Sequence, residues 1–232
     1  MNAIVLGGTG SVGRHVIKFL INSPQYNKVF VPVRKTLPEW KSFDIDEKQK
    51  MKIIRIKDLN FLCSTNENLL QMFDNEKIDS LFNCLGAASY DLENLILIDQ
   101  YYACKSAELC QRLNIDHFSI ISVANSSSTS NSPFYRTKAL AEQDILKMNI
   151  KFIDIYKPSR INGRANSGFS EKVFSWICCC FGGVESFELA KAMVVSDIIR
   201  KKRFGDGFGP GYKRLLDDED INFIAVNEKF RS

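Results

Sequence analysis

The chain has 232 residues, enough for one domain with a substantial core, and its 45% hydrophobic and 25% charged residues are typical of a globular protein. A formal net charge of +4 is too small to indicate a nucleic-acid-binding protein or one held on an anionic membrane. No apolar run reaches membrane-spanning length, so we expect no integral membrane segment. The N-terminal residues lead directly into an apolar strand without a charged leader, and we therefore expect a cytoplasmic protein.

Short apolar runs alternate with helical patterns along the chain. We predict six strands, at 4–6, 29–33, 53–56, 81–85, 118–121 and 152–156. We predict long helices over 93–113 and 132–148. Several of the strands are apolar without a period of two, which indicates a parallel sheet covered on both faces.

The sequence therefore predicts a single α/β domain, 1–232, with a doubly wound, mostly parallel, Rossmann-like sheet. We expect 161–232 to supply a small substrate-side cap and the C-terminal elements, including one at 221–226. Three segments are expected to be irregular: a charged connector at 35–50, a loop at 126–132 and a mobile excursion at 205–211.

The turn GGTGSVG at 7–13 follows the first strand and opens a helix. Its glycines fit both the Rossmann spacing GxGxxG and the GxxGxxG spacing of short-chain reductases. Such a turn lets backbone N–H groups and the positive helix N-terminus approach a pyrophosphate. We predict a dinucleotide-phosphate site at Gly7, Gly10, Ser11, Val12 and Gly13.

The second strand ends at Arg34 and Lys35, about twenty residues past the glycine turn. An NAD site usually has an acidic side chain here, which accepts a hydrogen bond from the ribose 2′-OH. Arginine would instead attract a 2′-phosphate. The sequence therefore favours NADP(H) over NAD(H), the alternative being a solvated basic pair at a strand end.

Four further turns carry a resemblance to a known family. They are Asp58-Leu59 after the third strand, Cys84-Leu85-Gly86 after the fourth, Ser122 after the fifth and Lys157-Pro158-Ser159-Arg160 after the sixth. Over nearly its whole length the chain resembles the atypical short-chain dehydrogenases/reductases, most closely the Tat-interacting-protein-like oxidoreductases. The resemblance implies that Asp58 and Leu59 lie beside the adenine, and that Cys84, Leu85, Gly86 and Pro158 lie beside the cofactor.

The resemblance also implies a serine, a tyrosine and a lysine as catalytic groups. Ser122 and Lys138 match the serine and the lysine, which also holds the nicotinamide ribose. The tyrosine departs from the pattern, because Tyr135 stands three residues before Lys138 and Phe134 occupies the family position four residues before it. Each helical residue turns by about 100°, so an intact helix cannot aim Tyr135 as the family does. A shifted start or a local distortion of the first helical turn after Pro133 would still allow Tyr135 to act as the catalytic acid, and both outcomes stay open. The alternative for Lys138 is a surface pair with Glu142.

Two functional hypotheses stay open. The chain is either an NADPH-dependent oxidoreductase of a small carbonyl or enone, or a cofactor-binding regulatory module that recruits a protein partner and turns over little.

We expect no metal site, and we expect reduced, unpaired cysteines. We interpret 173–181 as a short helix lining the substrate cleft, with membrane contact and acylation of Cys178–Cys180 as the alternative, and 200–203 as a solvated basic helix end.

Overall fold

The computed structural model describes residues 1–64, 67–87, 91–163, 183–205 and 211–227. Seven strands form the central sheet: β1 (Asn2–Leu6), β2 (Lys28–Val33), β3 (Met51–Arg55), β4 (Ser80–Asn83), β5 (His117–Ile121), β6 (Phe152–Tyr156) and β9 (Tyr212–Leu216). Their order is β3-β2-β1-β4-β5-β6-β9, and every pairing in the sheet is parallel. The predicted doubly wound α/β fold is confirmed. The order reverses between β1 and β4, and ligands of such sheets bind beyond the carboxyl ends of the strands at this point.

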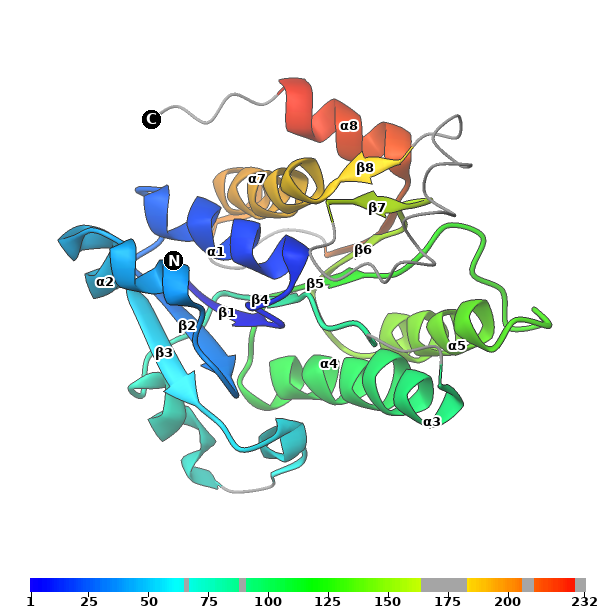
Figure 1. Cartoon of the computed structure of the whole chain (residues 1–232), viewed down its shortest axis with the longest axis horizontal. Helices are drawn as coiled ribbons and strands as arrows, with labels where there is room; N and C mark the ends of the chain where they lie inside the picture. Colours follow the sequence, from blue (N-terminus) through cyan, green and yellow to red (C-terminus); the bar gives the residue numbers. More distant parts are fainter. Residues whose placement is uncertain (65–66, 88–90, 164–182, 206–210, 228–232) are drawn as a thin grey trace.

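Helices cover both faces of the sheet (Figure 1). One face carries α1 (Ser11–Asn22), α7 (Ser186–Phe204) and α8 (Asp218–Asn227). The other carries α3 (Leu92–Asn94), the π-helix η4 (Leu95–Tyr101), α4 (Tyr102–Arg112) and α5 (Pro133–Lys147). The remaining elements are shorter: η1 (Pro38–Ser42), α2 (Ile45–Lys50), η2 (Leu59–Cys63), η3 (Glu67–Phe73), and the pair β7 (Ile161–Asn162) and β8 (Val184–Glu185).

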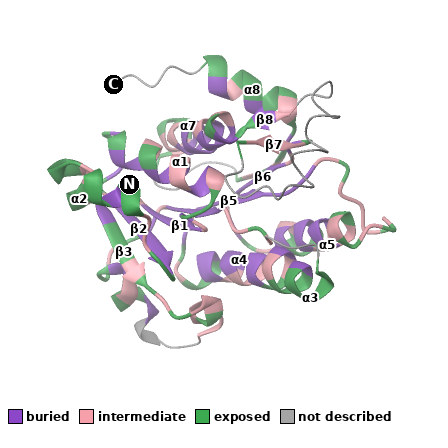
Figure 2. Cartoon of the chain, viewed as in Figure 1, coloured by how far each residue is buried: buried purple, intermediate pink, exposed green. Residues whose placement is uncertain are grey.

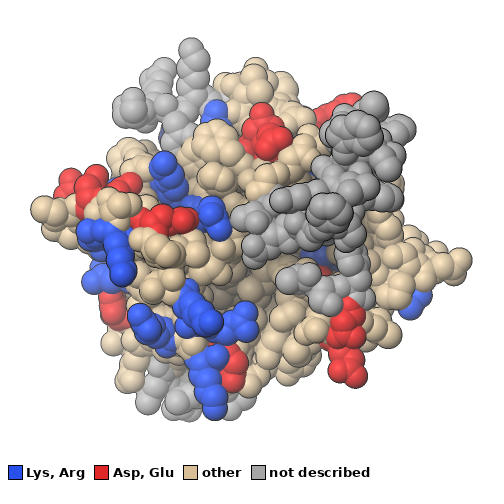
Figure 3. Space-filling view, viewed as in Figure 1, with Lys and Arg blue, Asp and Glu red and all other residues tan. Residues whose placement is uncertain are grey.

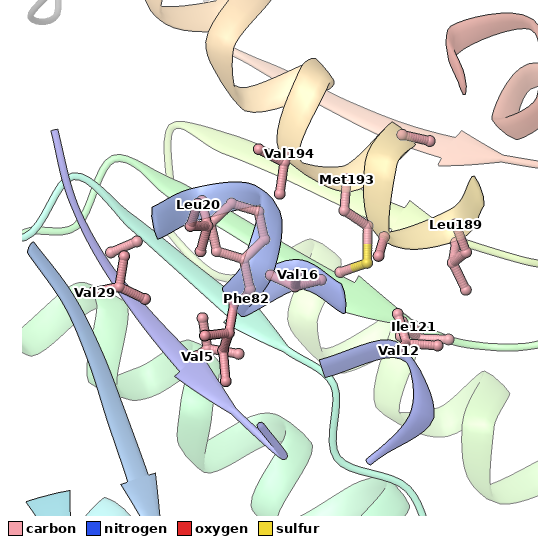
Figure 4. Packing of buried hydrophobic residues seen from close by; sticks show 14 of the residues in the cluster. Val5, Val12, Val16, Leu20, Val29, Phe82, Ile121, Leu189, Met193 and Val194 are labelled. Carbon is pink, nitrogen blue, oxygen red and sulfur yellow. The ribbon is translucent and has the colours of Figure 1, made fainter. Parts of the chain in front are cut away.

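Alternate residues of the inner strands pack into two separate hydrophobic cores. Ala3 and Val5 of β1 pack with α1 and α7, whereas Ile4 and Leu6 pack with the helices of the other face. The inner strands β1, β2, β4, β5 and β6 are therefore buried on both sides, whereas the edge strands β3 and β9 are partly exposed (Figure 2). Val16 and Leu20 of α1 lie among the residues that pack on the face of the sheet covered by α1 and α7 (Figure 4). This two-sided burial is why the strand sequences lack a period of two.

Several predicted elements differ from the structure. The connector expected at 35–50 is wrong, because it contains η1 and α2, and Asp44 and Glu47 form a capping box at the start of α2. The helix expected at 93–113 is divided by η4 and ends at Arg112. β9 was not predicted, and the C-terminal element is the helix α8. The segment 173–181, Cys178–Cys180 and most of 205–211 lie outside the described residues.

A buried ionic network ties β5, β6 and β9 to α7. His117 Nε2 lies 3.1 Å from Asp154 Oδ2, and His117 Nδ1 lies 3.0 Å from Asp197 Oδ1. Arg214 donates to both oxygens of Asp154, and Arg200 pairs with Asp197 at 2.8 Å. The interpretation of 200–203 as a solvated helix end is therefore wrong for Arg200, which is only 2% exposed.

Candidate functional site

The glycine turn forms a tight cradle between β1 and α1. Gly7 has φ of +74°, and a Cβ on it would lie 2.5 Å from the Cys84 carbonyl oxygen. A Cβ on Gly13 would lie 2.2 Å from the Gly7 carbonyl oxygen. The Gly10 N–H donates to the Gly7 carbonyl at 2.9 Å and closes the turn. These positions therefore require glycine, as the phosphate turn of a dinucleotide-binding fold does.

The first turn of α1 is free of competing negative charge. Gly10 is the N-cap, it makes no side-chain capping bond, and no acidic residue lies in the first turn. Ser11 is partly exposed and Val12 is buried against the core. Arg14 pairs with Glu39 at 3.5 Å on the surface. The positive helix end and the adjoining glycine backbone together fit the pyrophosphate of a dinucleotide.

Basic side chains lie near this cradle at the carboxyl end of β2. Arg34 and Lys35 are exposed, and neither has an ion-pair partner among the residues that the structure describes. Figure 3 shows lysine and arginine side chains gathered over the tips of β2 and β3, beside a hollow in the surface. Arg55, which ends β3 and pairs in register with Val33, adds a further exposed cation. This edge of the sheet suits an additional phosphate.

Asp58 has a local structural role. Its Oδ1 accepts from the Asn60 N–H at 2.9 Å and caps η2, which Leu59 opens. Both residues are partly exposed at the end of β3. The carboxylate thus fixes the turn in which the adenine contact is expected.

The turn after β4 lies directly against the glycine cradle. The Cys84 N–H donates to the Leu6 carbonyl at 3.0 Å, and the Leu85 N–H donates to Asn83 Oδ1 at 2.9 Å. Burial raises the pKa of the Cys84 thiol to about 12, so this cysteine is a neutral packing group. Gly86 is exposed, with open space where a Cβ would stand. Cys63, Cys84, Cys104 and Cys110 are all unpaired.

Ser122 and Lys138 come together beneath the carboxyl end of β5. They line a small void together with Asp99 of η4 and Glu142 of α5. Lys138 Nζ lies 2.9 Å from Asp99 Oδ1 and donates to the Ile121 carbonyl at 3.2 Å. Lys138 is only 8% exposed, so the alternative of a surface pair with Glu142 is wrong. Pro158 is buried nearby, and its carbonyl accepts from the Ala124 N–H at 3.0 Å.

Tyr135 lies apart from this pair. The helix α5 is regular from Pro133, so no distortion brings the tyrosine round to the face of Lys138. Tyr135 is 36% exposed, and its ring contacts the Phe134 ring with centroids 5.4 Å apart. The one-residue displacement seen in the sequence is thus retained in the folded helix.

Three charged residues of the site were not predicted from the sequence. Asp99 is buried opposite Lys138, and Glu142 accepts from Ser122 Oγ and, at 2.7 Å, from Ser126 Oγ. Lys157 Nζ lies 2.9 Å from Glu142 Oε2. A signal for Glu142 was its position one helical turn after Lys138, which places both residues on one face of α5. For Asp99, the signal was a lone carboxylate among the apolar residues of its helix.

A second hollow lies at the amino-terminal edge of the sheet, opposite the glycine cradle. It measures about 700 Å³ and is lined by residues before β5, before β6 and at the start of β9, such as Asn114, Asn149 and Lys213. The sequence motifs lie at the carboxyl edge, so this hollow has no part in the predicted site.

No protein-family model matches the chain. Two yeast relatives are both named "Protein FMP52, mitochondrial". The protein of Candida glabrata is 27% identical over 185 residues, covering 77% of this chain and 73% of the relative. The protein of Kluyveromyces lactis is 25% identical over 187 residues, covering 78% of each. The cytoplasmic location expected from the sequence is contradicted by these relatives, because their names place them in mitochondria.

Solved structures share the fold. MoeE5 in complex with UDP-glucose and NAD matches with a TM-score of 0.64 and 14% identity, over 94% of this chain and 75% of that one. UDP-glucuronic acid 4-epimerase from Bacillus cereus, in complex with UDP-glucuronic acid and NAD, matches with a TM-score of 0.62 and 15% identity, over 94% and 77%. No described helix is both long and apolar enough to cross a membrane. The chain shares the Rossmann-like α/β fold of these two solved structures.

Proposed function

We propose that the chain binds NADP(H) at the glycine cradle and is an oxidoreductase of the short-chain dehydrogenase/reductase type, acting on a small carbonyl or enone compound. The observation that carries the proposal is the cradle itself, where Gly7 and Gly13 leave no room for a Cβ. The structures that share the fold support a nicotinamide dinucleotide, because the titles of MoeE5 and of the epimerase name NAD.

The basic end of β2 is the reason for choosing NADP(H) over NAD(H). Arg34 and Lys35 stand where an NAD site has an acidic residue, and both are exposed and unpaired within the described chain. A guanidinium forms bidentate hydrogen bonds to phosphate, which an acidic side chain would repel. The choice depends on these two residues, since the related structures were solved with NAD.

Each of the other site residues has a role in this proposal. Gly10, Ser11 and Val12 hold the pyrophosphate with Gly7 and Gly13. Asp58 and Leu59 border the adenine, and Cys84, Leu85, Gly86 and Pro158 border the nicotinamide half. The dinucleotide supplies hydride chemistry when bound. Ser122 orients the substrate oxygen, and Lys138 holds the ribose once it exchanges its contact with Asp99. The region 161–184 borders the substrate, and most of it lies outside the described residues.

A second candidate is a cofactor-binding regulatory module that recruits a protein partner. The position of Tyr135 favours it, because this side chain is exposed and cannot share the void with Ser122 and Lys138. The resemblance to the Tat-interacting-protein-like oxidoreductases supports either candidate. Under both, the names of the yeast relatives support a location in mitochondria.

Consumption of NADPH with phenanthrenequinone, benzaldehyde and cyclohexenone separates the two candidates. If the chain is a reductase, the wild-type protein turns over at least one of these probes. The regulatory module binds NADPH and turns over none of them, and in that case Phe134→Tyr, which restores the family position of the acid, should create activity.

A further inference from the structure

Glu142 is a buried carboxylate at the centre of a chain of hydrogen bonds. It is 8% exposed and lies on the inner face of α5, one turn beyond Lys138. Its Oε1 accepts from Ser122 Oγ and from Ser126 Oγ, and its Oε2 accepts from Lys157 Nζ at 2.9 Å. The side chain of Lys157 is 19% exposed, so the outer end of this chain reaches solvent.

Lys138, which the family pattern would pair with a tyrosine, is occupied elsewhere. Its ammonium lies 2.9 Å from the buried carboxylate of Asp99, and Tyr135 is on the exposed side of α5. The tyrosine that the family uses as the acid is therefore missing from the site. Instead, the hydrogen bonds that run from Lys157 through Glu142 end at Ser122. A carboxylate within hydrogen-bonding reach of a hydroxyl is an arrangement that moves protons in general acid–base catalysis.

We propose that Ser122, Glu142 and Lys157 form the proton route of this site and replace the displaced tyrosine. Ser122 Oγ is the catalytic group that meets the substrate oxygen. Glu142 and Lys157 are positioning residues that return a proton to it. The inference rests on the proposed oxidoreductase function and names the groups that carry its proton.

The route balances in both directions. When a carbonyl is reduced, its carbon gains a hydride from the reduced dinucleotide, and the electron pair of the C=O π bond moves to oxygen. That oxygen takes the proton of Ser122 Oγ, and the alkoxide left on Ser122 takes a proton from the Glu142 carboxyl group. Glu142, ionised at rest, first receives this proton on Oε2 from Lys157 Nζ, and rotation of the carboxyl group turns the proton toward Ser122 Oγ. Lys157 regains its proton from water. In alcohol oxidation each proton moves the opposite way, toward Lys157 and solvent.

A measurement on the cofactor-free protein tests the inner link. A hydroxyl hydrogen held in a buried bond to a carboxylate exchanges slowly, and we expect a downfield proton resonance that disappears in Ser122→Ala. This resonance should shift in Glu142→Gln and stay unchanged in Tyr135→Phe. An unchanged resonance in Glu142→Gln, or the absence of any such resonance, would overturn the proposal.

Turnover tests the whole route with the three carbonyl probes. We expect Ser122→Ala and Glu142→Gln to lower kcat by about 100-fold, with NADPH affinity within about twofold of wild type. Glu142→Gln should also remove one limb of the pH–kcat profile, and Glu142→Asp, which keeps the carboxylate, should recover part of the rate. Tyr135→Phe is the matched control and should retain the wild-type rate and profile.

Each other outcome has a distinct meaning. Loss of turnover in Tyr135→Phe, with the profile intact in Glu142→Gln, would overturn the proton route. NADPH binding without turnover of any probe would also overturn it and leave cofactor binding standing. Failure to bind either dinucleotide would overturn the proposed function itself. If Glu142→Gln does not fold, Lys157→Gln breaks the outer link and should lower kcat in the same way.

Discussion

Gly7 joins the backbone of the glycine cradle to the turn after β4. Its positive φ and its approach to the Cys84 carbonyl each disfavour a side chain. We expect Gly7→Ala to lower the free energy of unfolding by more than about 1 kcal/mol, because a left-handed backbone alone has roughly that cost for an L-residue. Gly86→Ala is the control for stability, since its Cβ would meet open space. Urea unfolding of both variants measures the difference, and an equal loss in the two would contradict the strain assigned to Gly7.

Arg34 determines the preference between dinucleotides in this account. Arg34→Ala should weaken NADPH binding about tenfold or more, because a hydrogen bond to a charged group is worth about 1.5–3 kcal/mol. NADH affinity should stay within about twofold, since NADH has no 2′-phosphate. Lys52→Ala removes a charge at the other end of β3 and is the matched control. Fluorescence titration of the wild type and both variants measures the six affinities, and equal losses for NADPH and NADH in Arg34→Ala would remove Arg34 from the phosphate site.

The sequence predicted individual site residues only where the pattern was local. The glycine spacing and the displaced tyrosine are both short-range features, and the structure retains both. Glu142 was considered only as a surface partner of Lys138, because helical spacing shows that two residues share a face and not what packs against that face. Asp99 and Lys157 reach the site from other elements, so their contacts depend on tertiary packing.

The π-helix η4 packs against α5 and carries Asp99, the partner of Lys138. The Asp99 side chain is 2% exposed and that of Lys138 is 10% exposed, so removal of one charge leaves the other buried. We expect Asp99→Asn to lower the free energy of unfolding by about 3 kcal/mol. Asp144→Asn breaks the exposed pair with Lys147 on α5 and should cost less than about 1 kcal/mol. If urea unfolding gives similar losses of unfolding free energy for the two variants, the Asp99–Lys138 pair does not stabilise the fold.

The ionic network around His117 makes stability depend on pH. Burial by itself lowers the pKa of His117, but the charge of Asp197 and hydrogen bonds with Asp154 and Asp197 outweigh burial and raise this pKa. The stabilisation from a raised histidine pKa is fully present below the unfolded value near 6.5 and is lost as pH rises through the folded value. The pKa of Asp154 is lowered, despite burial, by His117 and Arg214, so its contribution is instead lost in acid.

We therefore expect the free energy of unfolding to fall as pH rises above about 6.5, over a range set by the folded pKa of His117. His117→Gln should be less stable at pH 6 and should lack this slope. Urea unfolding between pH 6 and 9 tests the sign, and a wild-type stability that rises with pH across this range would contradict it. The other ionisable groups of the network are Tyr26, Arg200, Arg214 and Tyr212.

At the scale of the whole molecule, the order of apolar runs was enough to predict a parallel sheet with helices on both faces. Six of its seven strands follow from those runs, and β6 begins and ends where expected. β9 could not be predicted, because alternate residues such as Lys213 and Leu215 are exposed at the edge of the sheet and its sequence has no continuous apolar run. The π-helix was also hidden, since its hydrogen bonding leaves no mark on an apolar sequence.

The expected substrate-side region, 161–232, has several structural roles. β9 extends the central sheet beside β6, and α7 packs on α1 opposite the glycine cradle. These elements belong to the body of the domain, β9 through the sheet and α7 through its packing on α1.

Calorimetric titration of the wild-type chain with NADPH and with NADH is the decisive measurement of dinucleotide binding at the glycine cradle. We predict one site per chain, with NADPH bound more tightly than NADH, and no binding of either by Gly13→Val, whose side chain would occupy the position of the Gly7 carbonyl. Tighter binding of NADH would contradict the role of Arg34 and Lys35. The absence of binding for both dinucleotides in the folded wild-type chain would contradict the account as a whole.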